Sequence, residues 1–406
     1  MTEHIRAMPE KRPRAEGTED EDVAIDEKLD WSDKQRRILT ADGKAAGYYT
    51  AENGYPCKES ELPHYWLSQG KEKLWKTFSG WRDMILSRDE RAMDSVQNAN
   101  SKSRIVGAWK RPLFYGGWEH STSETEHVFN VQTSTLFVDL RLPVKRLSRP
   151  NVGNLHDLTA QELRLYARQH CFAGFSWIQE PANTPEGFTQ VCARHHCIDW
   201  NYVGTPRNRP NKWWIEIHPN ETVWKEWAFA KDESGQHYYC ERWEALSAPQ
   251  KDKMVLALYQ PDMGGVIVVV GNHFNFCFDR PTQGVTNTPS SSSLVDLVDQ
   301  LVEQRDLDQA RQWLSLEGGH GTVSSGWIVD AAVQFWKEGK PLWSKTSAQW
   351  NRAPDEQSTN DPTMWWKDCS LHWEGQKWQI FECNLTSFAQ LQQVWASSFQ
   401  NACDKS

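Results

Sequence analysis

The chain has 406 residues and a formal net charge of −9, and hydrophobic residues make up 38% of it. This acidic composition argues against a general nucleic-acid binder, which usually carries a basic face. The longest apolar run, within GGVIVVVG at 264–271, is far too short to span a bilayer as a helix. The 23 Trp, 15 Phe and 10 Tyr residues can still bury enough area for a packed core.

The amino-terminal sequence and the cysteines bear on the cellular compartment. The segment MTEHIRAMPEKRPR has no apolar stretch, so it does not read as a secretory signal. The nine cysteines are scattered and form no CxxC pair. Together these features predict reduced thiols in the cytoplasm or the nucleus.

Residues 1–30 are acidic and nearly free of aromatic residues, and we expect a disordered tail. From residue 31 to about 100 the composition changes to helix-forming residues. The segment LPHYWLSQGKEKLWKTFSGWRDMIL, 62–86, carries apolar residues near helical spacing. We therefore expect a helical extension over 31–100 that docks onto a larger body or, through 31–96, onto a protein partner.

From residue 105 the apolar period changes to two, which is typical of strands. A helix over TAQELRLYARQ interrupts the run, and Thr159 and Glu162 fit a capping box at its start. The segment SLVDLVDQLVEQ predicts a second helix with an apolar stripe, continued over 306–313 after a break. The expected strands lie near 105–115, 126–132, 134–141, 172–180, 188–200, 211–218, 221–230, 236–245, 254–260, 264–271 and 273–279.

The last hundred residues are expected to hold more short strands, a polar loop at 344–361 and a closing helix at 387–399. We place these strands near 312–317, 327–336, 363–368, 371–375 and 377–383. Many strands without alternating βαβ units predict a mainly β protein, built as an antiparallel barrel or two barrel-like halves. We expect the first half at 105–281 and the second half, with its helix, at 282–400.

The segment IVGAWKR at 105–111 opens the β region with Gly107-x-Trp109. It resembles the first-strand signature of lipocalin-like (calycin) barrels. Segments further on, such as TSTLFVDLRLP, CARHHCIDW and HFNFCFDRP, are similar to lipocalin-like proteins with two barrel-like halves and no established chemistry. The resemblance implies a barrel with a cavity, in which Trp109 plugs one end and Arg280 covers it by cation–π stacking.

The segment VCARHHCIDWNYVG, 191–204, holds two cysteines, two histidines and an aspartate within eight residues. As a strand it alternates faces, which predicts His195 with Asp199 on one side and Arg194, His196 and Trp200 on the other. Residues i and i+4 lie about 13 Å apart, so Cys192 and His196 cannot share one zinc ion. We therefore expect no metal here, and the sequence does not decide which face points inward.

The strand 236–244 places four residues on one face: His237, Tyr239, Glu241 and Trp243. Aromatic walls with a few ionisable groups are what a ligand cavity needs, although tight cross-strand packing would use the same pattern. We take Arg194, His196, Trp200, Tyr239 and Trp243 as candidate ligand-binding residues. The candidates for acid–base catalysis are His195, Asp199, His237 and Glu241.

Three functions remain open. The first is a lipocalin-like protein that binds a small, largely apolar or aromatic ligand in a barrel cavity. The second is an interaction module with an inert barrel. The third is a barrel enzyme, an isomerase, cyclase or hydrolase. No phosphate loop or nucleophile elbow is present, and no motif identifies a cofactor.

Overall fold

The computed structural model describes residues 48–50, 56–58, 104–116, 120–146, 148–179, 190–201, 211–228, 239–248, 253–261, 264–281, 294–343, 347–352 and 362–403. Before residue 104 these include only two short paired strands, β1 (Tyr48–Thr50) and β2 (Pro56–Lys58). The predicted tail at 1–30 lies outside the described residues, as does the helical pattern at 62–86. In the described part of the chain, no helix is long and apolar enough to cross a membrane.

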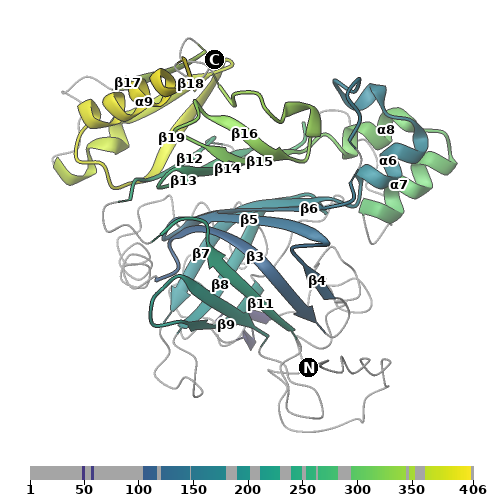
Figure 1. The fold of residues 1–406 in the computed structure, drawn as a ribbon, viewed down its shortest axis with the longest axis horizontal. Helices are drawn as coiled ribbons and strands as arrows, with labels where there is room; N and C mark the ends of the chain where they lie inside the picture. The colour runs from purple at the N-terminus through teal and green to yellow at the C-terminus, as the bar shows by residue number, and fades with distance from the viewer. Residues whose placement is uncertain are drawn as a thin grey trace, which may run out of the picture.

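The first large sheet closes on itself. Each strand from β5 onward pairs antiparallel with the next strand in the chain, β3 pairs with β5, and β11 returns to pair with β3. Eight of the described strands therefore form a barrel, and the short β4 extends one side of β3 (Figure 1). The strands are β3 (Gly107–Gly116), β4 (His120–Thr122), β5 (Glu126–Gln132), β6 (Leu136–Pro143), β7 (His170–Gln179), β8 (Gln190–Asp199), β9 (Asn211–Ile217), β10 (Val223–Trp227) and β11 (Tyr239–Ala245).

The second sheet is also antiparallel, with the strand order β16-β15-β14-β13-β12-β19-β18-β17. Its strands are β12 (Val255–Tyr259), β13 (Gly265–Val270), β14 (His273–Phe278), β15 (Glu317–Thr322), β16 (Ile328–Ala332), β17 (Ala348–Arg352), β18 (Cys369–Trp373) and β19 (Gln376–Cys383). The predicted division at residue 281 assigned β12–β14 to the first half, whereas these strands pair within the second sheet. The change between the two sheets therefore falls between Ala245 and Val255.

Short helices complete the fold. Between β6 and β7 lie η2 (Leu155–Asp157) and α6 (Ala160–Tyr166), and α6 begins with the predicted capping box of Thr159 and Glu162. In Figure 1, α6 lies beside α7 (Leu294–Glu303) and α8 (Leu307–Trp313) at one end of the molecule. The other helices among the described residues are η3 (Phe335–Lys337), η5 (Pro362–Asp368) and α9 (Phe388–Cys403). Helix α9 covers the side of the second sheet that faces away from the barrel.

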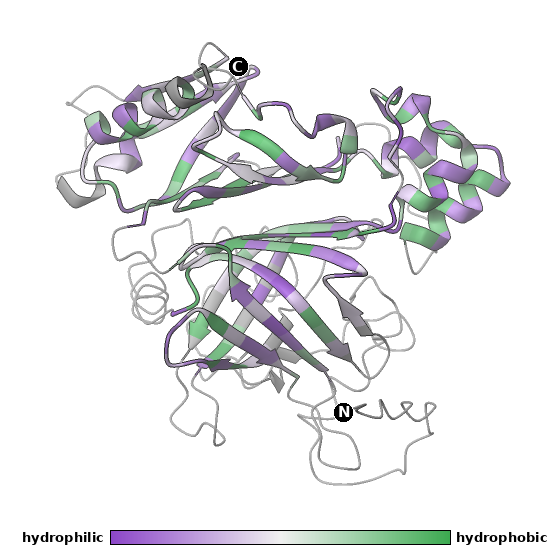
Figure 2. Ribbon diagram, viewed as in Figure 1, coloured by the Kyte–Doolittle hydropathy of each residue, from purple (hydrophilic) through white to green (hydrophobic). Residues whose placement is uncertain are grey.

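Three clusters of buried hydrophobic residues hold these layers together. One lies inside the barrel, one between the barrel and the second sheet, and one between the second sheet and α9. Strand β13 is buried on both faces: Val266 and Val268 face the barrel, while Ile267 and Val269 face α9. A strand buried on both faces is continuously apolar. Along the barrel strands, by contrast, hydrophilic and hydrophobic residues alternate (Figure 2).

The sequence misassigned several segments of the second half. The predicted strand at 312–317 is the end of α8 and a short turn, and the one at 363–368 is the 3-10 helix η5. The expected loop at 344–361 contains β17, and the glycine-rich segment 318–321 lies inside β15. These glycines permit close packing: a Cβ on Gly321 would lie 2.1 Å from the carbonyl oxygen of Ile328.

Candidate ligand site inside the barrel

A β-bulge in β8 sets which of its side chains face the barrel interior. Gly174 of β7 pairs with His196, but Ala173 pairs with Ile198, so β8 carries one extra residue at this point. An extra residue reverses the alternation of faces beyond it. Arg194 and His196 therefore face inward before the bulge, and Asp199 faces inward after it.

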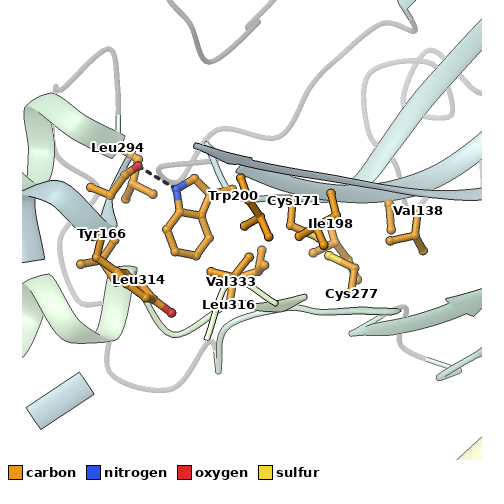
Figure 3. Packing of buried hydrophobic residues seen from close by; sticks show 14 of the residues in the cluster. Val138, Tyr166, Cys171, Ile198, Trp200, Cys277, Leu294, Leu314, Leu316 and Val333 are labelled. Atoms are coloured by element: carbon orange, nitrogen blue, oxygen red, sulfur yellow. Dashed lines mark hydrogen bonds between the residues drawn. The ribbon is translucent and has the colours of Figure 1, made fainter. Parts of the chain in front are cut away.

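The same bulge sends Trp200 to the outside of the barrel. Trp200 is fully buried in the cluster between the barrel, the second sheet and α6, where its indole Nε1 donates to the carbonyl oxygen of Ala167 at 3.0 Å. Figure 3 shows it next to Tyr166, Leu316 and Val333. The expectation that Trp200 shares a face with His196 is therefore wrong, because that face was extrapolated through the bulge.

Asp199 contacts two histidines inside the barrel. Its Oδ2 lies 2.7 Å from Nδ1 of His196, and its Oδ1 lies 3.2 Å from Nε2 of His170. The backbone N–H of Asn201 also donates to Oδ1 at 2.9 Å. The predicted separation of Asp199 from His196 is thus wrong. The side chain of His195 and all of His237 lie outside the described atoms.

The electrostatics of Asp199 follow from these contacts. Burial disfavours its charge, but hydrogen bonds from His170 and His196 hold the pKa of Asp199 well below its usual range. Phe172 stacks on His196 with 4.3 Å between ring centroids, which fixes that imidazole further. A carboxylate that orients an imidazole can support acid–base chemistry, and it can equally serve as a buried structural network.

Two arginines and their carboxylate partners form a chain of ion pairs that links β6 to β11 and to its neighbour β3. Nε of Arg141 lies 2.6 Å from Oδ1 of Asp139, and its Nη1 lies 3.4 Å from Oε1 of Glu241. Nη1 of Arg111 lies 3.0 Å from the same oxygen of Glu241, and Arg111 also pairs with Glu126. Burial opposes the charge of Arg141, yet the nearby Asp139 and Glu241 charges raise its pKa above the ordinary value.

Among the described side chains, Arg194 contacts aromatic rings and neutral polar groups instead of carboxylates. Its guanidinium lies 4.3 Å from the ring centroid of Phe137 and 5.4 Å from that of Trp213. It also donates to the hydroxyl of Ser176 at 3.2 Å and to the side-chain oxygen of Gln132. The guanidinium of Arg194 is thus a cation that lies against aromatic rings inside this barrel.

Glu226 of β10 is a buried carboxyl group of the barrel interior. It is 5% exposed, and its Oε2 is buried with no hydrogen-bond partner among the described residues. Its cross-strand neighbour is Glu241. Burial, followed by the charge of Glu241, raises the pKa of Glu226 to about 8, so the carboxyl group is mostly protonated at neutral pH.

In the described part of the chain, three indole N–H groups on neighbouring strands also lack hydrogen-bond partners. They belong to Trp213, Trp224 and Trp243, which are all at most 5% exposed. The rings of Trp224 and Trp243 are stacked with centroids 5.4 Å apart, and Trp109 meets Trp224 edge-on at 5.9 Å. Buried polar groups are normally hydrogen-bonded, so this set on β9–β11 needs an explanation.

The inferred pairing of Trp109 with Arg280 is wrong. Trp109 belongs to the cluster inside the barrel, and its indole N–H donates to the carbonyl oxygen of Ile105 at 2.9 Å. Arg280 instead lies over the ring of Trp313, 5.7 Å from its centroid, and donates to the carbonyl oxygens of Trp313 and Trp200. Arg280 thus ties α8 to the outside of the barrel.

Of the remaining predicted site residues, Tyr239, Glu241 and Trp243 all face the barrel interior. Glu226 and His170 also face the interior, and neither was predicted from the sequence. Alternation along VWKEW groups Glu226 with Trp224, but only the closure of the sheet shows that this face points inward. In the described part of the chain, no group of three or more His, Cys, Asp or Glu side chains is placed to hold a metal ion.

No protein-family model matches the sequence, and no curated protein matches it either. One solved structure is similar: the crystal structure of an uncharacterized protein, YLR301w, from Saccharomyces cerevisiae. It is 12% identical, with a TM-score of 0.35, and the match covers 68% of this chain and 98% of the yeast chain.

Proposed function

We propose that this protein binds a small, largely aromatic molecule inside the barrel. The observation that carries the proposal is the buried, unpartnered Oε2 of Glu226, together with the unpartnered indole N–H groups of Trp213, Trp224 and Trp243 on the same enclosed face. A bound molecule with polar atoms would complete these hydrogen bonds, and its flat part would lie against the tryptophan rings.

The carboxyl group of Glu226 is a more specific indication of a ligand than the indole N–H groups. The cluster between the second sheet and α9 also contains indole N–H groups without partners among the described residues, those of Trp343, Trp350 and Trp378. A lone indole N–H against apolar side chains is therefore not specific to the barrel. In the barrel, however, these groups accompany buried arginines and carboxylates, which a purely apolar ligand would leave unsolvated. We accordingly infer a ligand that is polar as well as aromatic.

Extraction of the native protein tests the proposal directly. The full chain, purified without denaturant, is analysed by native mass spectrometry and by solvent extraction followed by mass identification. We expect a stoichiometric small molecule whose mass is lost on unfolding. An unliganded mass, combined with no change in the melting temperature across a panel of small aromatic compounds, would refute the proposal.

Paired substitutions locate the bound molecule. Trp243→Phe removes one indole N–H inside the barrel while keeping an aromatic ring, and we expect it to weaken binding by about tenfold, the value of one lost hydrogen bond. Trp378→Phe makes the same change in the core beneath α9 and is the matched control, which should leave binding unchanged. Equal effects of the two substitutions would place the molecule elsewhere.

Acid–base catalysis is a second candidate, favoured by the contact of His170 and His196 with one carboxylate. Under this alternative the extracted compound is chemically altered when it is returned to the protein, and His196→Gln stops that change without abolishing binding. An interaction module built on residues 31–96 is a third possibility, which deletion of that segment and measurement of barrel stability would test.

A further inference from the structure

Carboxyl groups outnumber guanidinium groups in the described part of the barrel interior. Its described side chains include three guanidinium groups and five carboxyl groups, those of Arg111, Arg141, Arg194, Glu126, Asp139, Asp199, Glu226 and Glu241. Each arginine is already engaged, Arg194 with Gln132 and Ser176 and the other two with carboxylates.

Glu226 is the member of this set that lacks a cationic partner. Asp139, Glu126 and Glu241 pair with arginines, and Asp199 pairs with two histidines. Among the described side chains, no ion pair includes Glu226, and its Oε2 makes no hydrogen bond. Burying a carboxyl group without a partner costs free energy, which the protein reduces by retaining the proton. A positively charged ligand would remove the need for that proton.

The aromatic side chains around this carboxyl group favour an organic cation over an inorganic one. Trp213 already accepts the guanidinium of Arg194 on its face at 5.4 Å. The stacked rings of Trp224 and Trp243 lie on the same strand as Glu226 and on the strand beside it. A carboxylate beside indole faces is the chemistry that recognises protonated nitrogen compounds. A bare metal ion would require several oxygen, nitrogen or sulfur ligands instead.

We propose that the ligand is a small planar organic cation, such as a protonated amidine or nitrogen heterocycle, which donates a hydrogen bond to Glu226 and lies against the tryptophan rings. This inference rests on the proposed function, because it specifies what the barrel binds. A planar cation could form a charge-assisted hydrogen bond at one edge while its π face contacts indole. The cation takes the place of the carboxyl proton of Glu226, so binding leaves the net charge of the described interior unchanged.

Whether a proton is released on binding depends on the charged groups around Glu226. These are Glu241 on β11, Arg194 on β8, and Asp139 and Arg141 on β6. Glu241 and Asp139 oppose ionisation of Glu226, and the two arginines favour it. When the cation pairs with Glu226, the carboxyl proton leaves to solvent. The affinity for a permanently charged cation should therefore rise as the pH approaches about 8 and then level off.

The experiment compares two probes of equal shape. Benzamidine is a planar cation, and benzamide is its neutral counterpart. Each is titrated into the full chain by calorimetry at about pH 6, 7 and 8, in two buffers with different ionisation enthalpies, after removal of any co-purified compound. We expect benzamidine to bind about tenfold more tightly at pH 7 than at pH 6 and to release close to one proton at pH 7. Benzamide should bind at least about tenfold more weakly at pH 7.

Two variants assign the effect to one carboxyl group. Glu226→Gln keeps the shape but cannot ionise, so it should lose both the preference for benzamidine and the proton release. Glu216→Gln is the matched control on the outer face of β9, where Glu216 pairs with Lys225, and it should bind both probes as the native chain does. Circular dichroism checks that both variants are folded.

The outcomes separate this inference from the proposed function. A compound that co-purifies and is neutral or anionic overturns the cation assignment but leaves ligand binding intact. Benzamide that binds as tightly as benzamidine, or benzamidine binding without proton release, has the same consequence. If neither probe binds and no compound co-purifies, both proposals fail.

Discussion

Replacing Glu226 by glutamine should stabilise the unliganded protein, although the substitution falls in the middle of a barrel. Glutamine has nearly the same shape as a protonated glutamic acid and never ionises. In the native chain the buried carboxyl group holds its proton to a pKa of about 8, compared with 4.5 for the ordinary value. The folded state therefore binds a proton that the unfolded state releases.

The magnitude follows from linkage. Between about pH 4.5 and pH 8 the folded state carries more protons at Glu226 than the unfolded state, so stability falls as the pH rises through this window. Each pKa unit corresponds to 1.36 kcal/mol. Above pH 8 the shift therefore lowers the free energy of unfolding by about 5 kcal/mol. At pH 7 the loss is about 3 kcal/mol. Glu226→Gln removes this loss, so the free energy of unfolding of the variant should exceed that of the native chain by these amounts.

Urea unfolding, followed by tryptophan fluorescence, measures the effect at about pH 4, 7 and 9. The two proteins should unfold at nearly the same urea concentration at pH 4, and the variant should unfold at progressively higher concentrations at pH 7 and 9. Glu216→Gln on the outer surface is the control and should follow the native chain at every pH. A variant that is less stable at pH 9, or a difference that does not grow with pH, would refute the reasoning.

Three further predictions concern the framework around the site. Gly321→Ala should cost about 3 kcal/mol of unfolding free energy in urea, because its Cβ would lie 2.1 Å from the carbonyl oxygen of Ile328. Asn275→Ala should cost about 3 kcal/mol by the same measurement, because it removes hydrogen bonds to two carbonyl oxygens of the barrel and to His320. Asp199→Asn should cost about 3 kcal/mol at pH 7. The pKa of Asp199 is lowered on folding, so its stabilisation is present above its unfolded pKa and lost as the pH falls, and the cost should shrink when urea unfolding is repeated below about pH 3.

The sequence carried enough local information to place most barrel strands. An apolar period of two, broken by turn residues, follows from one face of each strand being buried. The capping box at Thr159 is likewise local, because its hydrogen bonds join residues three positions apart. The predicted mainly β fold with antiparallel sheets is confirmed. Membership in the lipocalin-like family remains a prediction.

The position of the site depended on information that is not local. Nothing in CARHHCIDW marks the extra residue of β8, because a bulge is defined by the pairing partner, here Ala173 and Gly174 of β7. Strict alternation therefore joined Asp199 to His195 instead of His196. The same limit applies to β12–β14, whose apolar pattern fits either sheet. Their assignment to the second sheet follows from long-range pairing with β15 and β19.

On β6 the usual distribution of polarity is reversed, and this helps the barrel to tolerate the charges of Asp139 and Arg141. On β6 the outward residues Leu136, Val138, Leu140 and Leu142 enter the core shared with the second sheet, whereas Asp139 and Arg141 point inward. Part of the apolar area that stabilises the barrel is thus buried outside it, in addition to the hydrophobic cluster inside. The interior does not have to supply the main hydrophobic core, and it can retain groups such as Glu226 that weaken the fold. Such a cost is expected where residues serve binding, because sites that need strained or unpaired groups trade stability for function.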